Sequence, residues 1–256
     1  MKLKNKILTT LAACLFSYSV ANAQISASSF NKGTFYYGLE YYNYHEIEDG
    51  HDPFMRIATH PWPTVVVGYS DYSNIRSNSK LEYPFIYFLE GSYGKNRYSQ
   101  YTGVGATNRT ETKVQTDISY VFPYNIYLGL GYRYLYDAGN TFRDRRNQLW
   151  YLPVGYGLKL NDGSNAKLQF NYLIKGTQVS YWSQELPGAS DVTMKQKHGW
   201  GLDLSYVPVE SQWEIYTKFW NIEKSPWTPY YLYKGNLYKF QEPHNFTYEI
   251  GFKHTF

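Results

Sequence analysis

The most constraining feature of this sequence is a two-residue alternation that continues to its final residue. In the last segment, NFTYEIGFKHTF, alternate positions from Phe246 to Phe256 are mostly aromatic or apolar. The positions between them, such as Glu249 and Lys253, are polar, small or charged. Because successive side chains of a β-strand point to opposite faces, this pattern predicts a strand with one apolar face and one polar face.

The same alternation recurs in nine earlier segments, so the sequence predicts ten strands in all. The apolar face of each strand often begins or ends with Tyr, Trp or Phe, as expected for side chains at a membrane interface. The predicted strands cover residues 35–42, 64–69, 82–90, 113–122, 126–136, 150–159, 167–175, 199–206, 213–220 and 246–256.

The polar faces decide between a soluble sandwich and a membrane barrel, because they carry many charged residues. Burying so many charges in a sandwich core would be prohibitive, and exposing the aromatic faces instead would promote aggregation. A barrel in a membrane avoids both problems, since its apolar face meets lipid and its charged face lines the lumen. We therefore predict an all-β fold, a transmembrane antiparallel up-and-down β-barrel of about 10 strands, with 8 or 12 as alternatives.

Composition agrees with this class of fold. The chain contains 30 Tyr, 14 Phe and 7 Trp, so a fifth of it is aromatic, yet it is hydrophilic on average. A barrel combines these properties because only alternate residues of each strand meet lipid. No segment after residue 23 approaches the roughly 18 consecutive apolar residues that a membrane helix needs, which excludes a helical membrane protein.

The N-terminus has the organisation of a secretory signal peptide. Three lysines occur within the first six residues, an apolar run follows over 7–20, and Ala21-Asn22-Ala23 is an A-x-A cleavage site. We expect residues 1–23 to be removed and residues 24–256 to form one barrel domain without cysteine. Cleavage before Cys14, as in lipoproteins, is the less favoured alternative because it leaves the following apolar run without a role.

Charge excludes one class of partner. Without the three signal lysines, the 25 Lys and Arg residues fall to 22, against 21 acidic residues. A nearly neutral mature chain does not indicate a nucleic-acid partner. We predict no cofactor either.

Connection lengths predict the orientation of the barrel. Short turns are expected at 123–125, 161–164 and 208–211, and longer connections at 47–53, 99–108, 138–146, 183–192 and 223–244. Short turns of such barrels are periplasmic and long loops are extracellular, so both termini are expected in the periplasm.

The aromatic terminal strand that ends in Phe256 resembles the C-terminal signature of bacterial outer-membrane proteins. The resemblance implies a location in the outer membrane, contact with its lipid and lipopolysaccharide, and recognition of Phe256 by the barrel assembly machinery. With ten strands, the architecture is also similar to that of the omptin proteases and the opacity-type adhesins. The chain shares no motif with either family, so no functional residues are transferred from them.

The predicted lumen carries six acidic and six basic residues. A barrel of about eight strands is filled by its own side chains, whereas porins with water channels have roughly 16 to 18 strands, so ten strands favour a paired, space-filling network. The alternative is a narrow channel for small solutes. The twelve residues are Glu40, Glu90, Lys113, Asp117, Arg133, Lys159, Lys175, Asp203, Glu214, Lys218, Glu249 and Lys253.

Two predicted loops have the composition of binding surfaces, one basic and one aromatic with lysines. Arginine and aromatic rings suit sugars and phosphates, through stacking and charge-assisted hydrogen bonds. Contact with anionic lipopolysaccharide explains the same composition equally well. The candidate ligand-binding residues are Arg143, Arg145 and Arg146 in the first loop, and Trp227, Tyr230, Tyr231 and Lys234 in the second, where residues 233–236 are the predicted hairpin tip.

The connection after the first predicted strand, a different loop from these two, is rich in titratable residues. His45, Glu48, Asp49, His51 and Asp52 are candidate ligands for a divalent metal or groups that activate water, as in a surface hydrolase similar to the omptins. Nothing in their spacing indicates convergence, and a solvated acidic turn is the favoured interpretation. We therefore predict no metal site and a non-enzymatic protein whose loops make surface contacts or bind an extracellular ligand.

Overall fold

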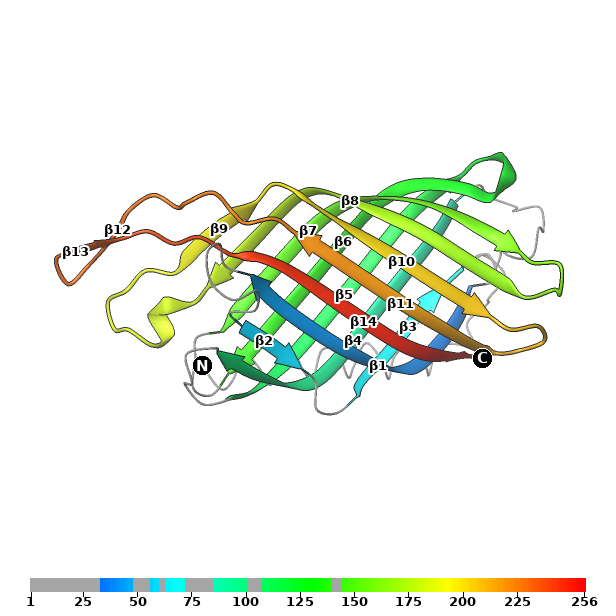
Figure 1. Cartoon of the computed structure of the whole chain (residues 1–256), viewed down its shortest axis with the longest axis horizontal. Coiled ribbons are helices and arrows are strands. Elements are labelled where there is room, and N and C mark those ends of the chain that lie inside the picture. Colours follow the sequence, from blue (N-terminus) through cyan, green and yellow to red (C-terminus); the bar gives the residue numbers. More distant parts are fainter. Residues whose placement is uncertain (1–32, 48–55, 60–62, 72–84, 101–106, 140–143) are drawn as a thin grey trace, which may run out of the picture.

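The computed structural model describes residues 33–47, 56–59, 63–71, 85–100, 107–139 and 144–256. Its architecture is a closed antiparallel β-barrel with ten strand positions. Figure 1 shows the barrel from the side. Eight positions are single strands: β1 (Thr34–Ile47), β4 (Phe85–Gln100), β5 (Thr107–Val121), β6 (Ile126–Gly139), β7 (Arg145–Lys159), β8 (Asn165–Ser180), β11 (Trp213–Ile222) and β14 (His244–Thr255).

The other two positions are each shared by two shorter strands. β2 (Arg56–Thr59) and β3 (Thr64–Ser70) both lie between β1 and β4. β9 (Val192–Gln196) and β10 (Gly199–Val207) both pair with β8. Outside the barrel, β12 (Tyr231–Tyr233) and β13 (Asn236–Tyr238) form a small separate hairpin.

The last strand closes the barrel against the first. β14 pairs with β1 from Thr255 opposite Tyr36 to His244 opposite Ile47, and with β11 on its other side. Neighbouring strands follow one another in sequence, so the topology is up-and-down. The predicted fold class is confirmed. Within the described residues, no helix is both long and apolar enough to cross a membrane.

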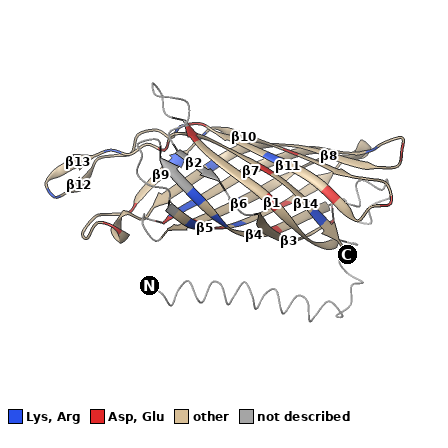
Figure 2. Cartoon of the chain, turned by 60° about the horizontal axis from the view of Figure 1, so that its bottom comes forward, with Lys and Arg blue, Asp and Glu red and all other residues tan. Residues whose placement is uncertain are grey.

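The two faces of the barrel wall differ as the alternation predicts. Residues such as Leu89, Ile118 and Ile215 are more than half exposed on the outer surface, whereas charged residues on the same strands are buried in the lumen. Figure 2 shows Lys, Arg, Asp and Glu residues along the barrel strands as well as at both ends. A structure with paired strands, an apolar exterior and a charged interior satisfies the conditions for crossing a membrane as a barrel.

The two ends of the barrel differ in their connections. At the end that contains the C-terminus, called here the turn end, the connections after β5, β7 and β10 are short, and the opposite loop end carries the β12–β13 hairpin (Figure 1). In the turn after β7, Ser164 donates its backbone N–H (2.9 Å) and its hydroxyl (2.6 Å) to Asp162 Oδ1. These bonds lower the pKa of the exposed Asp162 carboxyl.

Tyrosine rings fill part of the lumen by lying over glycines of the neighbouring strand. Tyr151 stands opposite Gly131, and a Cβ atom at Gly131 would lie 2.2 Å from the Tyr151 ring. Tyr127 lies over Gly155 in the same way. A glycine at these positions lets a large ring lie flat against the wall, so the lumen fills without widening the barrel.

Candidate functional site

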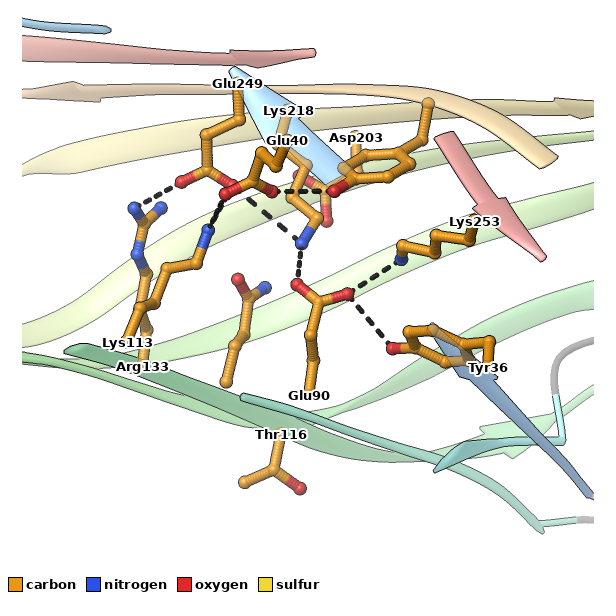
Figure 3. A network of polar contacts seen from close by, with 12 residues as sticks. Tyr36, Glu40, Glu90, Lys113, Thr116, Arg133, Asp203, Lys218, Glu249 and Lys253 are labelled. Carbon is orange, nitrogen blue, oxygen red and sulfur yellow. Dashed lines mark hydrogen bonds and ion pairs between the residues drawn. The ribbon is translucent and has the colours of Figure 1, made fainter. Parts of the chain in front are cut away.

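The middle of the lumen is crossed by a network of ion pairs with Glu249 at its centre (Figure 3). Glu249 Oε2 lies 2.7 Å from Lys113 Nζ, and Glu249 Oε1 lies 2.6 Å from Arg133 Nη2. Lys113 also donates to Glu40 Oε1 at 2.7 Å. All four side chains are buried, so their charges are balanced by one another rather than by solvent.

Glu90 is the second centre of the same network. It forms ion pairs with Lys218 and with Lys253 (2.7 Å), and it accepts a hydrogen bond from the Tyr36 hydroxyl (3.0 Å). Lys218 links the two centres because its Nζ also lies 3.8 Å from Glu249 Oε2. Figure 3 shows these side chains pointing toward one another from different parts of the wall.

Seven of the twelve predicted lumen charges therefore meet in one place. They come from β1, β4, β5, β6, β11 and β14, so the network ties together opposite sides of the barrel. The members of this mid-lumen network are Glu40, Glu90, Lys113, Arg133, Lys218, Glu249 and Lys253.

Three further predicted charges line a cavity at the turn end, called here the vestibule. Its volume is about 270 Å³, and Asp117, Asp203 and Glu214 form part of its wall. Lys218 and Lys253 of the mid-lumen network also line it, which places the network at the inner limit of the vestibule.

Two predicted lumen residues, Lys159 and Lys175, are exposed and lie outside the mid-lumen network, and the prediction that Lys175 faces inward was wrong. The strand register shifts where Trp150 pairs with Lys175 and Tyr151 pairs with Leu173. This bulge turns both Ile174 and Lys175 outward, whereas a regular strand would turn Lys175 inward. Lys159 is the final residue of β7, where the lumen opens to solvent.

A second buried cluster lies at the loop end and was not predicted. Arg145 donates to Glu46 Oε1 (2.8 Å) and to Glu242 Oε1 (2.7 Å). Gln178 donates to Glu242 Oε2, and the Tyr44 hydroxyl donates to Glu46 Oε1 at 2.9 Å. This loop-end cluster could have been anticipated in part, because Glu46 keeps the inward parity of Glu40 along the same strand.

The prediction that places Arg145 in a loop, as a candidate ligand-binding residue, is therefore wrong about the loop. β7 begins at Arg145 rather than near Trp150, because the strand continues with polar residues beyond its apolar band. Arg145 is buried and Arg146 is half-buried. Arg143 lies outside the described residues.

The predicted aromatic loop is a two-stranded projection, called here the arm, that comprises residues 223–243. Lys234 (φ 48°) and Gly235 (φ 78°) form the tight turn between β12 and β13, at the predicted hairpin tip. Trp227 and Tyr230 are each 61% exposed, Tyr231 is half-buried and Lys234 is exposed. The structure thus places these four candidates on one projecting element.

Hydrogen bonds continue from the tip of the arm to its base. The Thr228 N–H donates to the Phe240 carbonyl (2.8 Å), and the Ser225 N–H donates to the Glu242 carbonyl (3.0 Å). The Glu242 N–H donates in turn to Ser225 Oγ at 2.8 Å. Because Glu242 also belongs to the loop-end cluster, the base of the arm is attached to the barrel wall.

The remaining titratable candidates are dispersed. Glu48, Asp49, His51 and Asp52 lie outside the described residues, and the His45 ring stacks on Phe246 with centroids 4.8 Å apart. In the part of the chain that the structure describes, no group of three or more His, Cys, Asp or Glu side chains is arranged to hold a metal ion.

The turn end carries two distinctive groups. Phe256 is 73% exposed, its N–H donates to the Phe35 carbonyl (3.1 Å), and its ring contacts Tyr37. Asp71, directly after β3, is nearly inaccessible to solvent and accepts the Tyr87 N–H at 2.6 Å. Burial raises the pKa of the Asp71 carboxyl to about 7, even though this hydrogen bond favours its charged form.

Paired strands, an apolar exterior and a charge-filled lumen define the class of the molecule: a small transmembrane-type β-barrel. No protein-family model matches the chain, and no curated protein matches it. Among solved structures, it is similar to the translocator domain of the autotransporter NalP from Neisseria meningitidis, at 9% identity and a TM-score of 0.41 over 97% of each chain.

Two further solved structures are similar in the same way. The outer-membrane protease OmpT from Escherichia coli has 11% identity and a TM-score of 0.39, over 88% of this chain and 96% of that one. An outer-membrane channel from Pseudomonas putida F1 has 8% identity and a TM-score of 0.43, over 91% of this chain and all of that one.

Proposed function

We propose that this barrel is a non-enzymatic outer-membrane protein with a closed lumen, whose loop end makes contacts at the cell surface. The observation that carries the proposal is the mid-lumen network, in which Glu249 and Glu90 form ion pairs with four lysine and arginine side chains across the barrel. Passage of an ion through this section would separate buried pairs, and an unpaired buried charge is strongly destabilising.

The volumes around the network support a closed lumen. Between it and the loop-end cluster lie cavities of only about 40 Å³ and 20 Å³, lined by Tyr42 and Leu135 among others. A cavity needs at least about 10–15 Å³ to hold one water molecule, so these spaces suit isolated waters rather than a continuous column. The vestibule is then a blind recess.

The engagement of the loop-end carboxylates supports a non-enzymatic role. Glu46 and Glu242 are both bound to Arg145, and Asp137 accepts a hydrogen bond from Arg109 Nε at 2.8 Å. Carboxylates held in such pairs stabilise the wall and are poorly placed to accept a proton from a substrate.

The topology of the protein in the membrane is part of the proposal. The signal peptide is removed, the turn end and both termini face the periplasm, and the loop end is extracellular. The exposed Phe256 is the residue that the assembly machinery recognises, and the arm and the loops meet lipopolysaccharide and extracellular ligands.

Single-channel recording tests the closed lumen. Refolded residues 24–256 in a planar bilayer should give no discrete conductance steps, and an Arg133→Ala/Glu249→Ala double variant that still folds should give more openings than the wild type. Reproducible steps from the wild-type barrel would overturn the proposal. The vestibule would then be the entrance of a narrow solute channel, which is the second candidate function.

A further inference from the structure

One face of the arm exposes apolar side chains without a covering element. Leu232 and Leu237 stand opposite each other in the ribbon and are 70% and 63% exposed. Two positions from these leucines in sequence, Tyr230 and Lys239 are also exposed, and the Lys239 ammonium lies 4.5 Å from the centre of the Tyr230 ring. Exposed apolar surface of this kind, bordered by charge, marks an interaction site.

Between Glu223 and Glu242, which lie at its base, the arm carries charge of one sign. Lys224, Lys234 and Lys239 are its basic residues, and no acidic residue occurs over 224–241. Two leucines, exposed aromatic rings and lysines together have the composition of a segment that lies in a lipid interface. Sugars are bound through aromatic stacking and polar groups, so a saccharide would leave the leucine pair unexplained.

The base of the arm sets its direction. Arg145 and Gln178 hold Glu242, and the Trp182 ring contacts Phe240 with centroids 5.3 Å apart. From this base the arm runs away from the barrel at the loop end, as Figure 1 shows. An extended chain advances about 3.3 Å per residue, so the tip reaches up to ~40 Å beyond the end of β11. Lipids around the barrel wall are not in its path.

From these observations we propose that the arm inserts its Tyr230, Leu232 and Leu237 face into the anionic phospholipid surface of an apposed membrane, with Lys234 and Lys239 on the headgroups. This inference rests on the proposed function, because it requires the loop end to face outward. Apolar insertion supplies the contact area, and the lysines select negatively charged lipid.

Vesicle flotation tests the proposal with the whole mature chain in phosphatidylcholine nanodiscs. We expect the nanodiscs to float with vesicles that contain phosphatidylserine and not with vesicles of phosphatidylcholine alone. Each Lys near an anionic surface is worth about fivefold in binding, so Lys234→Gln/Lys239→Gln should weaken flotation by roughly 30-fold.

Two further variants separate insertion from simple charge attraction. Leu232→Ser/Leu237→Ser should reduce binding about tenfold or more. Val209→Ser is the matched control, because Val209 is 52% exposed in a turn at the opposite end of the barrel. The control should bind like the wild type. Equal binding to neutral vesicles, or full binding by the leucine variant, would overturn the proposal.

A soluble anionic polysaccharide tests the other class of partner. Dextran sulfate should displace vesicles only at concentrations where it screens charge generally. If it binds the arm tightly and the leucine variant retains that binding, the partner is a saccharide and the lipid proposal is wrong. Conductance is recorded in a planar bilayer with the same refolded protein. A silent barrel that binds no vesicles overturns this inference alone, whereas a conducting barrel overturns the closed lumen and leaves the arm to its own test.

Discussion

The mid-lumen network and the arm distribute charge and apolar surface in opposite ways. In the lumen, Glu249 and Lys113 are almost inaccessible to solvent and their charges are matched by direct contacts. In the arm, Leu232 and Leu237 are largely exposed, and Lys234 and Lys239 lie in a stretch, 224–241, that contains no acidic residue. Buried matched charge holds a structure closed, whereas exposed apolar surface with unmatched charge is available to a partner.

Both regions depend on ion pairs, but in different roles. The mid-lumen network joins strands across the barrel, and in the proposed function it closes the lumen. The loop-end cluster joins β1, β7 and β8 to the base of the arm and determines how the arm is directed. The contrast predicts that substitutions in the first cluster change global stability, while substitutions in the second change the order of the arm.

The largest effect is expected from Glu249→Gln, which removes the shared partner of Lys113 and Arg133. Breaking a buried pair by removing one partner costs about 3–5 kcal/mol, so the free energy of unfolding should fall by that amount. Urea unfolding in phospholipid vesicles, followed by tryptophan fluorescence, measures it. Lys175→Gln is the control, and a change within about 0.5 kcal/mol is expected at this exposed position. Equal losses in both variants would contradict the importance of the network.

The next largest effect is expected from Arg145→Gln, which leaves Glu46 and Glu242 without their cation. We expect a local loss of roughly 2–4 kcal/mol, because these carboxylates remain buried. The Ser225 amide proton, which is hydrogen-bonded to the Glu242 carbonyl, should then exchange faster with solvent, while amide protons in the middle of β5 stay protected. Hydrogen–deuterium exchange measures both. Arg146→Gln is the control, and unchanged exchange at Ser225 in Arg145→Gln would show that the arm is held by other contacts.

A smaller effect is expected from Gly131→Ala, because the new Cβ would lie 2.2 Å from the Tyr151 ring. Overpacking of this kind costs about 1–3 kcal/mol. The matched control is Gly91→Ala in β4, where the nearest atom to a new Cβ lies 4.0 Å away. Thermal unfolding of the two variants in detergent should separate them, and equal midpoints would show that the tyrosine ring moves aside freely.

The smallest effect concerns Asp71, whose carboxyl has a pKa raised to about 7. The folded protein therefore retains a proton that the unfolded chain has lost, and stability should decrease as pH rises from about 4 to about 7. Asp71→Asn keeps an acceptor for the Tyr87 N–H and should remove this pH dependence, which we expect to be no more than ~1–2 kcal/mol at a rim position. Unfolding at pH 5 and pH 8 measures it.

Asp162→Asn is the control for the pH experiment. The pKa of the Asp162 carboxyl is lowered in the folded protein. Its contribution to stability is therefore present above the pKa that this carboxyl has in the unfolded chain, and it is lost only on further acidification. Removing the Asp162 carboxyl should not alter the difference in the free energy of unfolding between pH 5 and pH 8. If the wild-type protein were equally stable at the two pH values, the raised pKa of the Asp71 carboxyl would be contradicted.

Sequence alternation predicted most of the barrel because it acts locally. Period two follows from strand geometry, and the charged residues that share one parity require a lumen. The same alternation identified Glu40, Glu90 and Glu249 as inward residues, and the hairpin tip at Lys234 and Gly235 followed from local turn chemistry. These inferences needed no knowledge of which strands are neighbours.

What the sequence by itself determined was therefore the class of fold, the approximate strands and the inward parity of most lumen charges. Only the tertiary structure decided which charges meet, that a bulge turns Lys175 outward, and that Arg145 is buried against Glu46 and Glu242. The physical reason is separation along the chain. Ion pairs across a lumen join residues from distant strands, and their partners depend on register and closure, which local pattern does not encode.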